Sequence, residues 1–423
     1  MVAPTSVCAN WLLEATRFAP SLRIAEYAGP NRSELLSELS SAAAPDLVVC
    51  SYGLVQQDIE LLLGIEWGSV ILDEAQFIKN PQSERARAVC RLSAKCRIAA
   101  TGTPVENHIG DLWSIFNFLN PGLFGAWRTF KRRFARPIEQ NESDSARAVL
   151  AEQIKPFILR RTKAEVLADL PPLTVVNHSV QLSEAETLAY GLLRRQIHDK
   201  LHTPHGRRDN KIEILAEITR LRRFCCHPRL VFPQAESDAS KVTALLDLVL
   251  ELRENQHRVL IFSQFVDFLE ILRERLEEAQ VSYQYLDGST PRAARQARVE
   301  AFQAGESTAF LISLKAGGFG LNLTAADYVI HADPWWNPAV EAQASDRAHR
   351  IGQERPVTVY RLITKHTIEE SIVELHRNKR AMADALLEGG SRAAELSSGE
   401  LVALIERESV SAADRASRRD PPA

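Results

Sequence analysis

The sequence predicts an α/β protein in which two regions of alternating strands and helices flank a helix-rich middle. Short apolar runs that end at polar or turn residues recur before residue 122 and again after residue 240. Runs of this kind are typical of parallel strands, which present ligand-binding loops at their carboxyl ends. Between the two regions, amphipathic helical patterns dominate. The length of 423 residues is enough for two or three such domains.

Residues 1–121 are expected to form the first lobe. Three short apolar runs predict strands here, at residues 46–51, 69–72 and 97–100. Each run stops at a polar or turn residue, where a parallel sheet places its functional loops.

Residues 122–235 are expected to be helical and to contact nucleic acid. Amphipathic stretches cover residues 144–155, 183–201 and 210–225, with a stiff joint at Pro171-Pro172. This segment holds 20 Lys+Arg and 12 Asp+Glu, whereas the rest of the chain holds 31 and 42. A local basic surface suits a duplex backbone, although a solvated helix face would have the same composition. The densest basic cluster consists of Arg128, Lys131, Arg132, Arg133 and Arg136.

Residues 236–388 repeat the strand–helix alternation and are expected to form a second lobe. Thr290 is expected to cap a helix that has Pro291 at its first position. Residues 389–423 read as a polar, partly disordered tail with a short helix at 398–408. The helices expected in this lobe lie at 240–254, 266–279 and 367–387, and the strands at 258–262, 283–286, 310–313, 328–332 and 357–362.

Composition narrows the class of protein. Hydrophobic residues make up 45% and charged residues 25%, which is ordinary for a protein with packed cores. No apolar run approaches the ~20 residues of a membrane helix, so a membrane partner is not expected. Six cysteines show no paired metal-ligand spacing, which favours a reduced compartment. The expected location is the cytoplasm, with nucleoid association, in a bacterium and the nucleus in a eukaryote.

Two segments far apart in the chain predict a nucleotide site. Residues 67–76 (WGSVILDEAQ) form an apolar run that ends in Asp73 and Glu74, a pattern that delivers a Mg²⁺-linked carboxylate and a water-activating carboxylate to a sheet edge. In a helix, Gln343, Arg347 and Arg350 would share one face, where two guanidiniums suit a phosphate that gains charge. Each segment alone is also compatible with a solvated strand end or a wet helix face.

Further motifs follow in a fixed order along the chain, and together they resemble the Swi/Snf family of superfamily 2 helicase-like ATPases, which are DNA translocases. The resemblance runs from about residue 4 to about residue 380. Its motifs are residues 101–107 (TGTPVEN), 111–113 (DLW), 118–121 (FLNP), 157–163 (FILRRTK), 170–172 (LPP), 221–228 (LRRFCCHP), 259–265 (VLIFSQF), 285–290 (YLDGST), 313–323 (SLKAGGFGLNL) and 333–338 (DPWWNP).

The resemblance implies two RecA-like lobes of the P-loop NTPase type, with ATP and Mg²⁺ as cofactors. Asp73 would hold the Mg²⁺ and Glu74 would polarise the attacking water, while Arg347 and Arg350 would reach the γ-phosphate. Gln343 and Gly320 would lie close to the nucleotide. The implied partner is double-stranded DNA, bound without sequence preference, and the object of remodelling would be a DNA-bound protein such as RNA polymerase or a chromatin protein. Five residues would contact nucleic-acid phosphates: Ser6, Thr103, Ser289, Ser313 and Lys315.

One departure from the family pattern limits the expected activity. The family needs a glycine-rich loop that ends in Gly-Lys-Thr or Gly-Lys-Ser, and none of the 19 glycines here precedes a lysine. We therefore expect a first lobe truncated at its N-terminus and a chain that hydrolyses ATP weakly or not at all. Two other interpretations remain open: a strand-separating helicase of the same superfamily, and a catalytically dead nucleic-acid-binding remnant.

Overall fold

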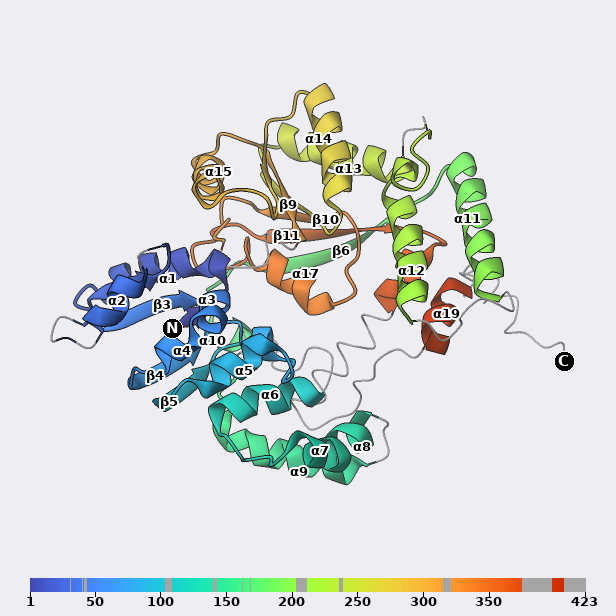
Figure 1. Ribbon diagram of the computed structural model, residues 1–423. Helices are drawn as coiled ribbons and strands as arrows, with labels where there is room; N and C mark the ends of the chain where they lie inside the picture. Colours follow the sequence, from blue (N-terminus) through green and yellow to red (C-terminus); the bar gives the residue numbers. More distant parts are fainter. Residues whose placement is uncertain are drawn as a thin grey trace. The chain divides into compact units, whose positions relative to one another are not determined.

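The protein forms two compact units, each built on its own fully parallel sheet (Figure 1). Of the described residues, those up to Leu159 belong to the first unit and those from Arg160 onward to the second. Among the described residues, no helix is both long and apolar enough to cross a membrane. The computed structural model describes residues 1–30, 32–39, 41, 44–102, 109–139, 143–161, 163–167, 169–202, 211–235, 239–314, 321–374 and 398–406.

The first unit has a five-stranded sheet in the order β2-β3-β1-β4-β5. The central strand β1 has only two residues, and it pairs with β3 and β4 on either side. Apolar side chains of β1, β3 and β4, including Val2, Val49 and Leu72, are buried. The strands are β1 (Val2–Ala3), β2 (Ile24–Tyr27), β3 (Leu47–Ser51), β4 (Trp67–Leu72) and β5 (Ala94–Ala99).

Helices join these strands, and serine side chains cap several of them. Ser51 accepts a hydrogen bond from Leu54 N at the start of α3, and Ser83 does the same for Ala86 N at the start of α5. The helices of this part are α1 (Thr5–Phe18), α2 (Arg32–Glu38), α3 (Tyr52–Gln57), α4 (Ile59–Leu62), the 3₁₀ turn Ala75–Ile78, α5 (Glu84–Arg91) and α6 (Ile109–Leu119).

A second, smaller core of the first unit lies under the basic cluster. Phe130, Phe134 and Ile138 are buried together with apolar residues of α6 and α9. The five basic residues of the cluster are all exposed on the same helical segment. That segment consists of α7 (Trp127–Phe130), a π-helical turn (Lys131–Ala135) and α8 (Arg136–Glu139), and it is followed by α9 (Asp144–Ile154) and the 3₁₀ turn Lys155–Phe157.

The second unit has a six-stranded sheet in the order β6-β11-β10-β7-β9-β8. Every residue of β7 and β9 is buried, as expected for central strands of a parallel sheet that is covered on both faces. The strands are β6 (Leu173–Val180), β7 (Val259–Ser263), β8 (Tyr283–Leu286), β9 (Ala309–Ser313), β10 (Tyr328–His331) and β11 (Val357–Thr364).

Two buried apolar clusters lie against this sheet, and a third joins the helices beside it. The third cluster brings together α11, α12 and α19 through residues such as Leu193, Ile218 and Leu401. The helices are α10 (Lys163–Val166), α11 (Glu184–His202), α12 (Lys211–Cys226), the 3₁₀ turn Pro228–Leu230, α13 (Ser240–Glu254), α14 (Val266–Glu278), α15 (Arg292–Ala304), α17 (Pro338–Ser345) and α19 (Ser398–Glu406).

Most expected elements are present, and the exceptions have physical reasons. Strands β1, β2 and β6 were not expected, because two are short and β6 is an edge strand in which Val175 and Val176 are exposed. The expected cap at Thr290 is wrong: Pro291 occupies the N-cap position of α15, and the Thr290 hydroxyl donates to the Asp287 carboxylate at 3.0 Å. The expected helix at 367–387 is helical over 368–374, and its remainder lies outside the described residues.

Candidate active site

Asp73 and Glu74 lie at the carboxyl edge of the first sheet, directly after β4. The Asp73 N–H donates to Val2 O of β1 at 2.8 Å, and the Ala75 N–H donates to Ala100 O after β5 at 3.0 Å. The chain between these two bonds is therefore fixed from both sides. Glu74 takes the left-handed conformation, with φ 51° and ψ 54°, which is uncommon for a residue other than glycine. This turn directs the chain into the 3₁₀ helix that follows.

Three neighbours fix the orientation of Asp73. The Trp11 indole N–H of α1 donates to Oδ2 at 2.7 Å, and the Glu74 backbone N–H donates to Oδ1 at 2.9 Å. The Tyr52 hydroxyl donates to the Asp73 carbonyl oxygen at 2.8 Å. Burial, followed by the nearby charges of Asp73 and Glu74, raises the pKa of Tyr52, so the phenol remains a donor. The Tyr52 ring also stacks on Phe77, with centroids 5.4 Å apart.

A short chain of hydrogen bonds connects Glu74 to the strand on its other side. The Gln76 amide donates to Glu74 Oε2 at 2.6 Å, and the Thr101 hydroxyl donates to Gln76 Oε1 at 2.7 Å. Thr101 begins the segment 101–107, which follows β5. Gln76 thereby links Thr101 to the Glu74 carboxylate.

The donors at this edge fit a Mg²⁺ ion. Asp73 is half-buried, and each of its carboxylate oxygens has one protein donor, so each keeps a lone pair for a further partner. Hard oxygen ligands, with water completing the shell, are what Mg²⁺ prefers. Asp73 is thus suited to hold the ion. Glu74 is the next residue, and its carboxylate accepts from Gln76.

The arginine segment of the second unit differs from the helix that the spacing predicts. Helix α17 ends at Ser345, so Gln343 is helical while Arg347 and Arg350 lie in the turns that follow. The Arg347 N–H donates to Ala344 O at 3.2 Å and the Ala348 N–H to Ser345 O at 3.1 Å, which is the tighter i to i−3 pattern. The prediction that all three residues lie in one helix is therefore wrong. We call residues 346–353 the arginine turn.

Gln353 closes the arginine turn. Its side-chain amide donates to three carbonyl oxygens, those of Thr324, Ala326 and Ala348, at 3.1, 2.8 and 3.0 Å. Its side-chain oxygen accepts the next two backbone N–H groups, and the residue is 8% exposed. The Arg347 carbonyl oxygen also accepts the Leu323 N–H at 3.1 Å. The turn is thereby attached to residues 323–326, which lie at and just after the end of the motif 313–323.

The segment that opens the second unit contacts the arginine turn directly. Lys163 donates to Asp346 Oδ1 at 2.5 Å and to His349 O at 2.8 Å. The His349 imidazole Nε2 lies 2.7 Å from Pro171 O. Two residues of the opening segment thus bind the residues adjacent to Arg347 and Arg350.

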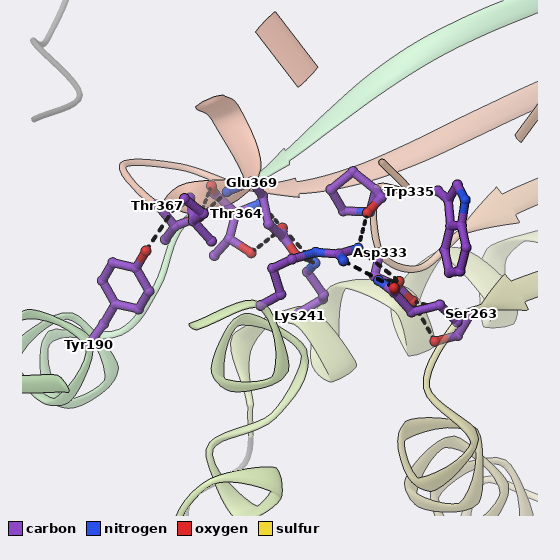
Figure 2. Close-up of polar contacts among 12 residues, drawn as sticks. Tyr190, Lys241, Ser263, Asp333, Trp335, Thr364, Thr367 and Glu369 are labelled. Atoms are coloured by element: carbon purple, nitrogen blue, oxygen red, sulfur yellow. Dashed lines mark hydrogen bonds and ion pairs between the residues drawn. The ribbon is translucent and has the colours of Figure 1, made fainter. Parts of the chain in front are cut away.

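A buried polar network lies at the carboxyl ends of β7, β10 and β11 (Figure 2). Lys241 of α13 and Glu369 are fully buried, with Nζ 2.6 and 2.7 Å from the two carboxylate oxygens. Glu369 also accepts the Thr364 N–H and hydroxyl, at 2.8 and 2.7 Å. Burial is the largest influence and lowers the pKa of Lys241, but the charge of Glu369, the nearby cysteines and the hydrogen bond to Glu369 together outweigh it, so that pKa is raised.

Asp333 forms a second part of this network. It accepts from Ser263 and from the Gln264 side chain, and Arg222 lies 3.9 Å away. Burial raises the pKa of Asp333, and the Arg222 charge opposes that rise. Arg222 also donates to Gln264 Oε1 at 3.0 Å and lies over the Trp336 ring at 5.7 Å. The network ties α12 and β7 to the loop that carries residues 333–338.

The predicted nucleic-acid residues are only partly described. Ser289 is exposed after β8, and its hydroxyl donates to Asp287 Oδ1 at 2.7 Å. Ser313 ends β9 and is 2% exposed, so its side chain faces protein. Ser6 lies in the first turn of α1, but its side chain is outside the described part of the chain. Thr103, Lys315 and the nucleotide candidate Gly320 also lie outside the described residues.

The sequence did not single out several residues that shape these sites. Trp11, Tyr52 and Gln76 orient the carboxylates, and Lys163 and His349 brace the arginines. Gln76 and Lys163 lie inside recognised motifs, which was the available signal. Trp11 and Tyr52 carry no local pattern, because their role depends on contacts across 62 and 21 positions of the chain.

Comparison with known proteins gives a consistent result. The SNF2-related domain matches residues 1–230, and the helicase conserved C-terminal domain matches residues 240–352. A Bacillus subtilis protein, YwqA, described provisionally as an ATP-dependent helicase/translocase, is 39% identical over 413 residues, which cover 96% of this chain and 45% of that protein. The human SWI/SNF-related matrix-associated actin-dependent regulator of chromatin subfamily A member 1 is 35% identical over 92% of this chain and 39% of its own length.

One similar solved structure is titled Sulfolobus solfataricus SWI2/SNF2 ATPase core in complex with dsDNA. Its sequence is 36% identical, the match covers 97% of this chain and 86% of the Sulfolobus chain, and the TM-score is 0.48. The chain spans less than half the length of the two curated relatives described above. Since the SNF2-related domain alone matches more than half of its residues, this chain belongs to the SNF2-related family of ATP-dependent helicase-like proteins.

Proposed function

We propose that this chain is the core of a DNA-dependent ATPase that moves along duplex DNA and displaces bound proteins. The observation that supports this most is the fixed pair Asp73–Glu74 at the carboxyl edge of the first sheet, within a family whose members depend on ATP. The names of the relatives refer to translocation and to chromatin, which is the class of partner proposed here. Such a core works where the DNA lies, in the nucleoid or the nucleus.

The proposed chemistry divides between the two units. Asp73 would hold Mg²⁺, and that ion, when bound, neutralises part of the phosphate charge. Glu74 would orient and polarise the attacking water, and Arg347 and Arg350 would stabilise charge that develops on the γ-phosphate. Gln343 and Gly320 would lie near the nucleotide. The proposal requires these groups to act on the same nucleotide.

The same proposal includes a limit on activity. The 423 residues contain no Gly-Lys pair, and therefore no backbone cradle and lysine of the P-loop type for the β- and γ-phosphates. We infer that this chain alone hydrolyses ATP slowly, while its DNA contacts persist. Those contacts would include Ser6, Thr103, Ser289 and Lys315 together with the basic cluster, whereas the buried Ser313 is no longer a candidate.

The basic cluster is the strongest part of the DNA-binding proposal. Arg128, Lys131, Arg132, Arg133 and Arg136 are all exposed, while the apolar residues between them are buried. An amphipathic segment with one cationic face and one core face can hold several phosphates at once, without reading bases.

Salt dependence tests this proposal. Replacing Lys131, Arg132 and Arg133 by Gln should weaken duplex binding, and should lower the slope of log K against log salt by ~0.9 for each lost phosphate contact. A matched control replaces Arg23 and Arg91, which are exposed in the same unit but already paired with Asp46 and Glu60. Equal slopes for both variants would reject the cluster as a DNA surface.

Strand separation is the alternative activity, and it is distinguished by substrate. A translocase displaces a third strand from a triplex and leaves the duplex intact, whereas a strand-separating helicase releases a single strand from the duplex. We expect only triplex displacement, measured with a fluorescent third strand on a form that hydrolyses ATP.

A further inference from the structure

Two histidines and a glutamate converge outside the sites described above. His198 and His202 lie one turn apart near the end of α11, and Glu406 ends α19. The two imidazole rings are stacked, with centroids 4.0 Å apart and planes at 19°. One ligand atom from each of the three residues lies within 4.8 Å of the other two. Metal–ligand distances of ~2 Å place the ligand atoms of a tetrahedral shell ~3.3 Å apart, so small side-chain rotations would bring these three atoms to one ion.

The second nitrogen of each ring already has an acceptor. His202 Nδ1 lies 2.8 Å from His198 O, and His198 Nδ1 lies 3.3 Å from Asp199 Oδ1. Histidines that bind metals usually donate their other N–H to a backbone carbonyl or a carboxylate, which fixes the tautomer. This arrangement leaves Nε2 of both rings as the atom available to a ligand.

The contact between His202 and Glu406 calls for a cation. His202 Nε2 lies 3.1 Å from Glu406 Oε1. A neutral imidazole that donates from Nδ1 presents a lone pair at Nε2, and this lone pair would face the carboxylate oxygen. Either a proton on Nε2 or a metal ion shared by the two atoms removes that repulsion.

We propose that His198, His202 and Glu406 bind a Zn²⁺ ion that fastens α19 to α11. Two imidazoles and one carboxylate form a zinc ligand set that leaves a fourth position for water. Mg²⁺ prefers oxygen ligands and would bind here poorly. The three side chains are partly exposed, at 47%, 27% and 40%, so an ion can enter from solvent.

The position of the site gives the ion a structural role. Leu401, Val402, Leu404 and Ile405 of α19 are buried against α11 and α12, so the helix already docks through an apolar face. A metal bound at Glu406 would close the end of that docked helix. Because the ion binds the folded arrangement, zinc stabilises it by mass action. This inference is independent of the proposed ATPase activity.

The test measures zinc binding by the full chain through competition with a chromophoric chelator. All proteins carry Cys96→Ser, because Cys96 is an exposed thiol that could bind zinc. The parent should take up one equivalent at this site, and its unfolding temperature should rise with zinc but not with Mg²⁺. Loss of an outer-shell partner weakens metal binding by about 10- to 100-fold, so loss of a ligand in His202→Ala or in Glu406→Gln should weaken it by at least ~100-fold.

A control variant and a folding check complete the experiment. His366→Asn removes another exposed histidine, and asparagine tolerates the positive φ of 58° at that position. This variant should bind zinc as the parent does. Glu406→Gln keeps the size of the side chain, and its circular dichroism should match that of the parent. No zinc uptake, or equal uptake by the parent, His202→Ala and Glu406→Gln, would overturn the proposal and leave the contact as a protonated His–Glu pair.

Discussion

His331 is a residue whose protonation the fold opposes. It is the last residue of β10 and is 1% exposed. Its Nε2 lies 2.9 Å from the hydroxyl of Ser345, which ends α17 two positions before Arg347. Burial, helped by the positive charge of Arg361, lowers the pKa of His331 to about 3. The unfolded chain therefore takes up this proton first as the pH falls. His331 contributes stability above pH ~6.5 that is lost progressively toward pH 3.

This shift predicts a measurable pH dependence. Between pH 6.5 and 4.5 the loss of stability from this one group should steepen from about 0.7 to at most about 1.4 kcal/mol per pH unit in the parent, whereas His331→Gln should lose less over the same range. Urea unfolding at several pH values measures the difference. The exposed His366 supplies the control, since His366→Asn should leave the slope unchanged. Parallel slopes for the parent and His331→Gln would contradict the burial argument.

The Lys241–Glu369 pair predicts an asymmetric response to substitution. Both side chains are fully buried, so Lys241→Met leaves a carboxylate without its counter-charge. We expect the free energy of unfolding to fall by about 3–5 kcal/mol. The double variant Lys241→Met, Glu369→Gln should recover part of that loss, because the amide oxygen can still accept from Thr364. Denaturant unfolding of the parent, the two single variants and the double variant measures the interaction energy between the two side chains. A Lys241→Met protein as stable as the parent would refute this prediction.

At the scale of elements, the segment that opens the second unit braces the arginine turn. Lys163→Met removes the bonds to Asp346 Oδ1 and His349 O, so the backbone bonds of residues 347–349 should open more often. Amide exchange there should rise roughly fivefold, as expected for a loss of about 1 kcal/mol. Exchange in β10 should not change. Lys365→Met, at an exposed lysine, is the control, and equal exchange in both variants would show that Lys163 does not brace the turn.

The predictability of the elements depended on how far local sequence controls them. The apolar runs of β7 and β9 were readable because every residue in them is buried. Strand β6 was not, because it pairs with β11 about 180 positions away and exposes much of its surface. The arginine turn was misread as helix because its spacing fits 3.6 residues per turn, while Gln353 and Leu323 impose tighter bonds from outside.

The polar groups also differ in how far the local sequence predicts them. Asp73 and Glu74 could be predicted because they end a recognisable strand, and the structure places them at the carboxyl edge of their sheet. The buried pairs of the second unit could not, since Lys241 and Glu369 are 128 positions apart and only the fold joins them. The meeting of the Asp73–Glu74 pair with Arg347 and Arg350 in one closed cleft stays a prediction.

At the scale of the whole molecule, the chain belongs to an ATP-dependent family, and we expect it to hydrolyse ATP slowly by itself. The family depends on ATP, the carboxylates are in place, and the 423 residues contain no Gly-Lys pair. DNA binding should therefore persist and fall steeply with salt, because its contacts do not require a bound nucleotide. Hydrolysis should require a phosphate loop that is supplied to the chain.

DNA-stimulated ATP hydrolysis tests this central claim most directly. It should be measured on the 423-residue chain and on a fusion that supplies a Gly-Lys-Thr phosphate-loop strand ahead of Met1. The chain alone should stay near background, while the fusion should turn over ATP. In the fusion, Glu74→Gln should lower the rate by at least ~100-fold and Arg347→Ala by about 1,000-fold. Robust turnover by the 423-residue chain, abolished by Glu74→Gln, would contradict the account, as would a fusion whose rate ignores both substitutions.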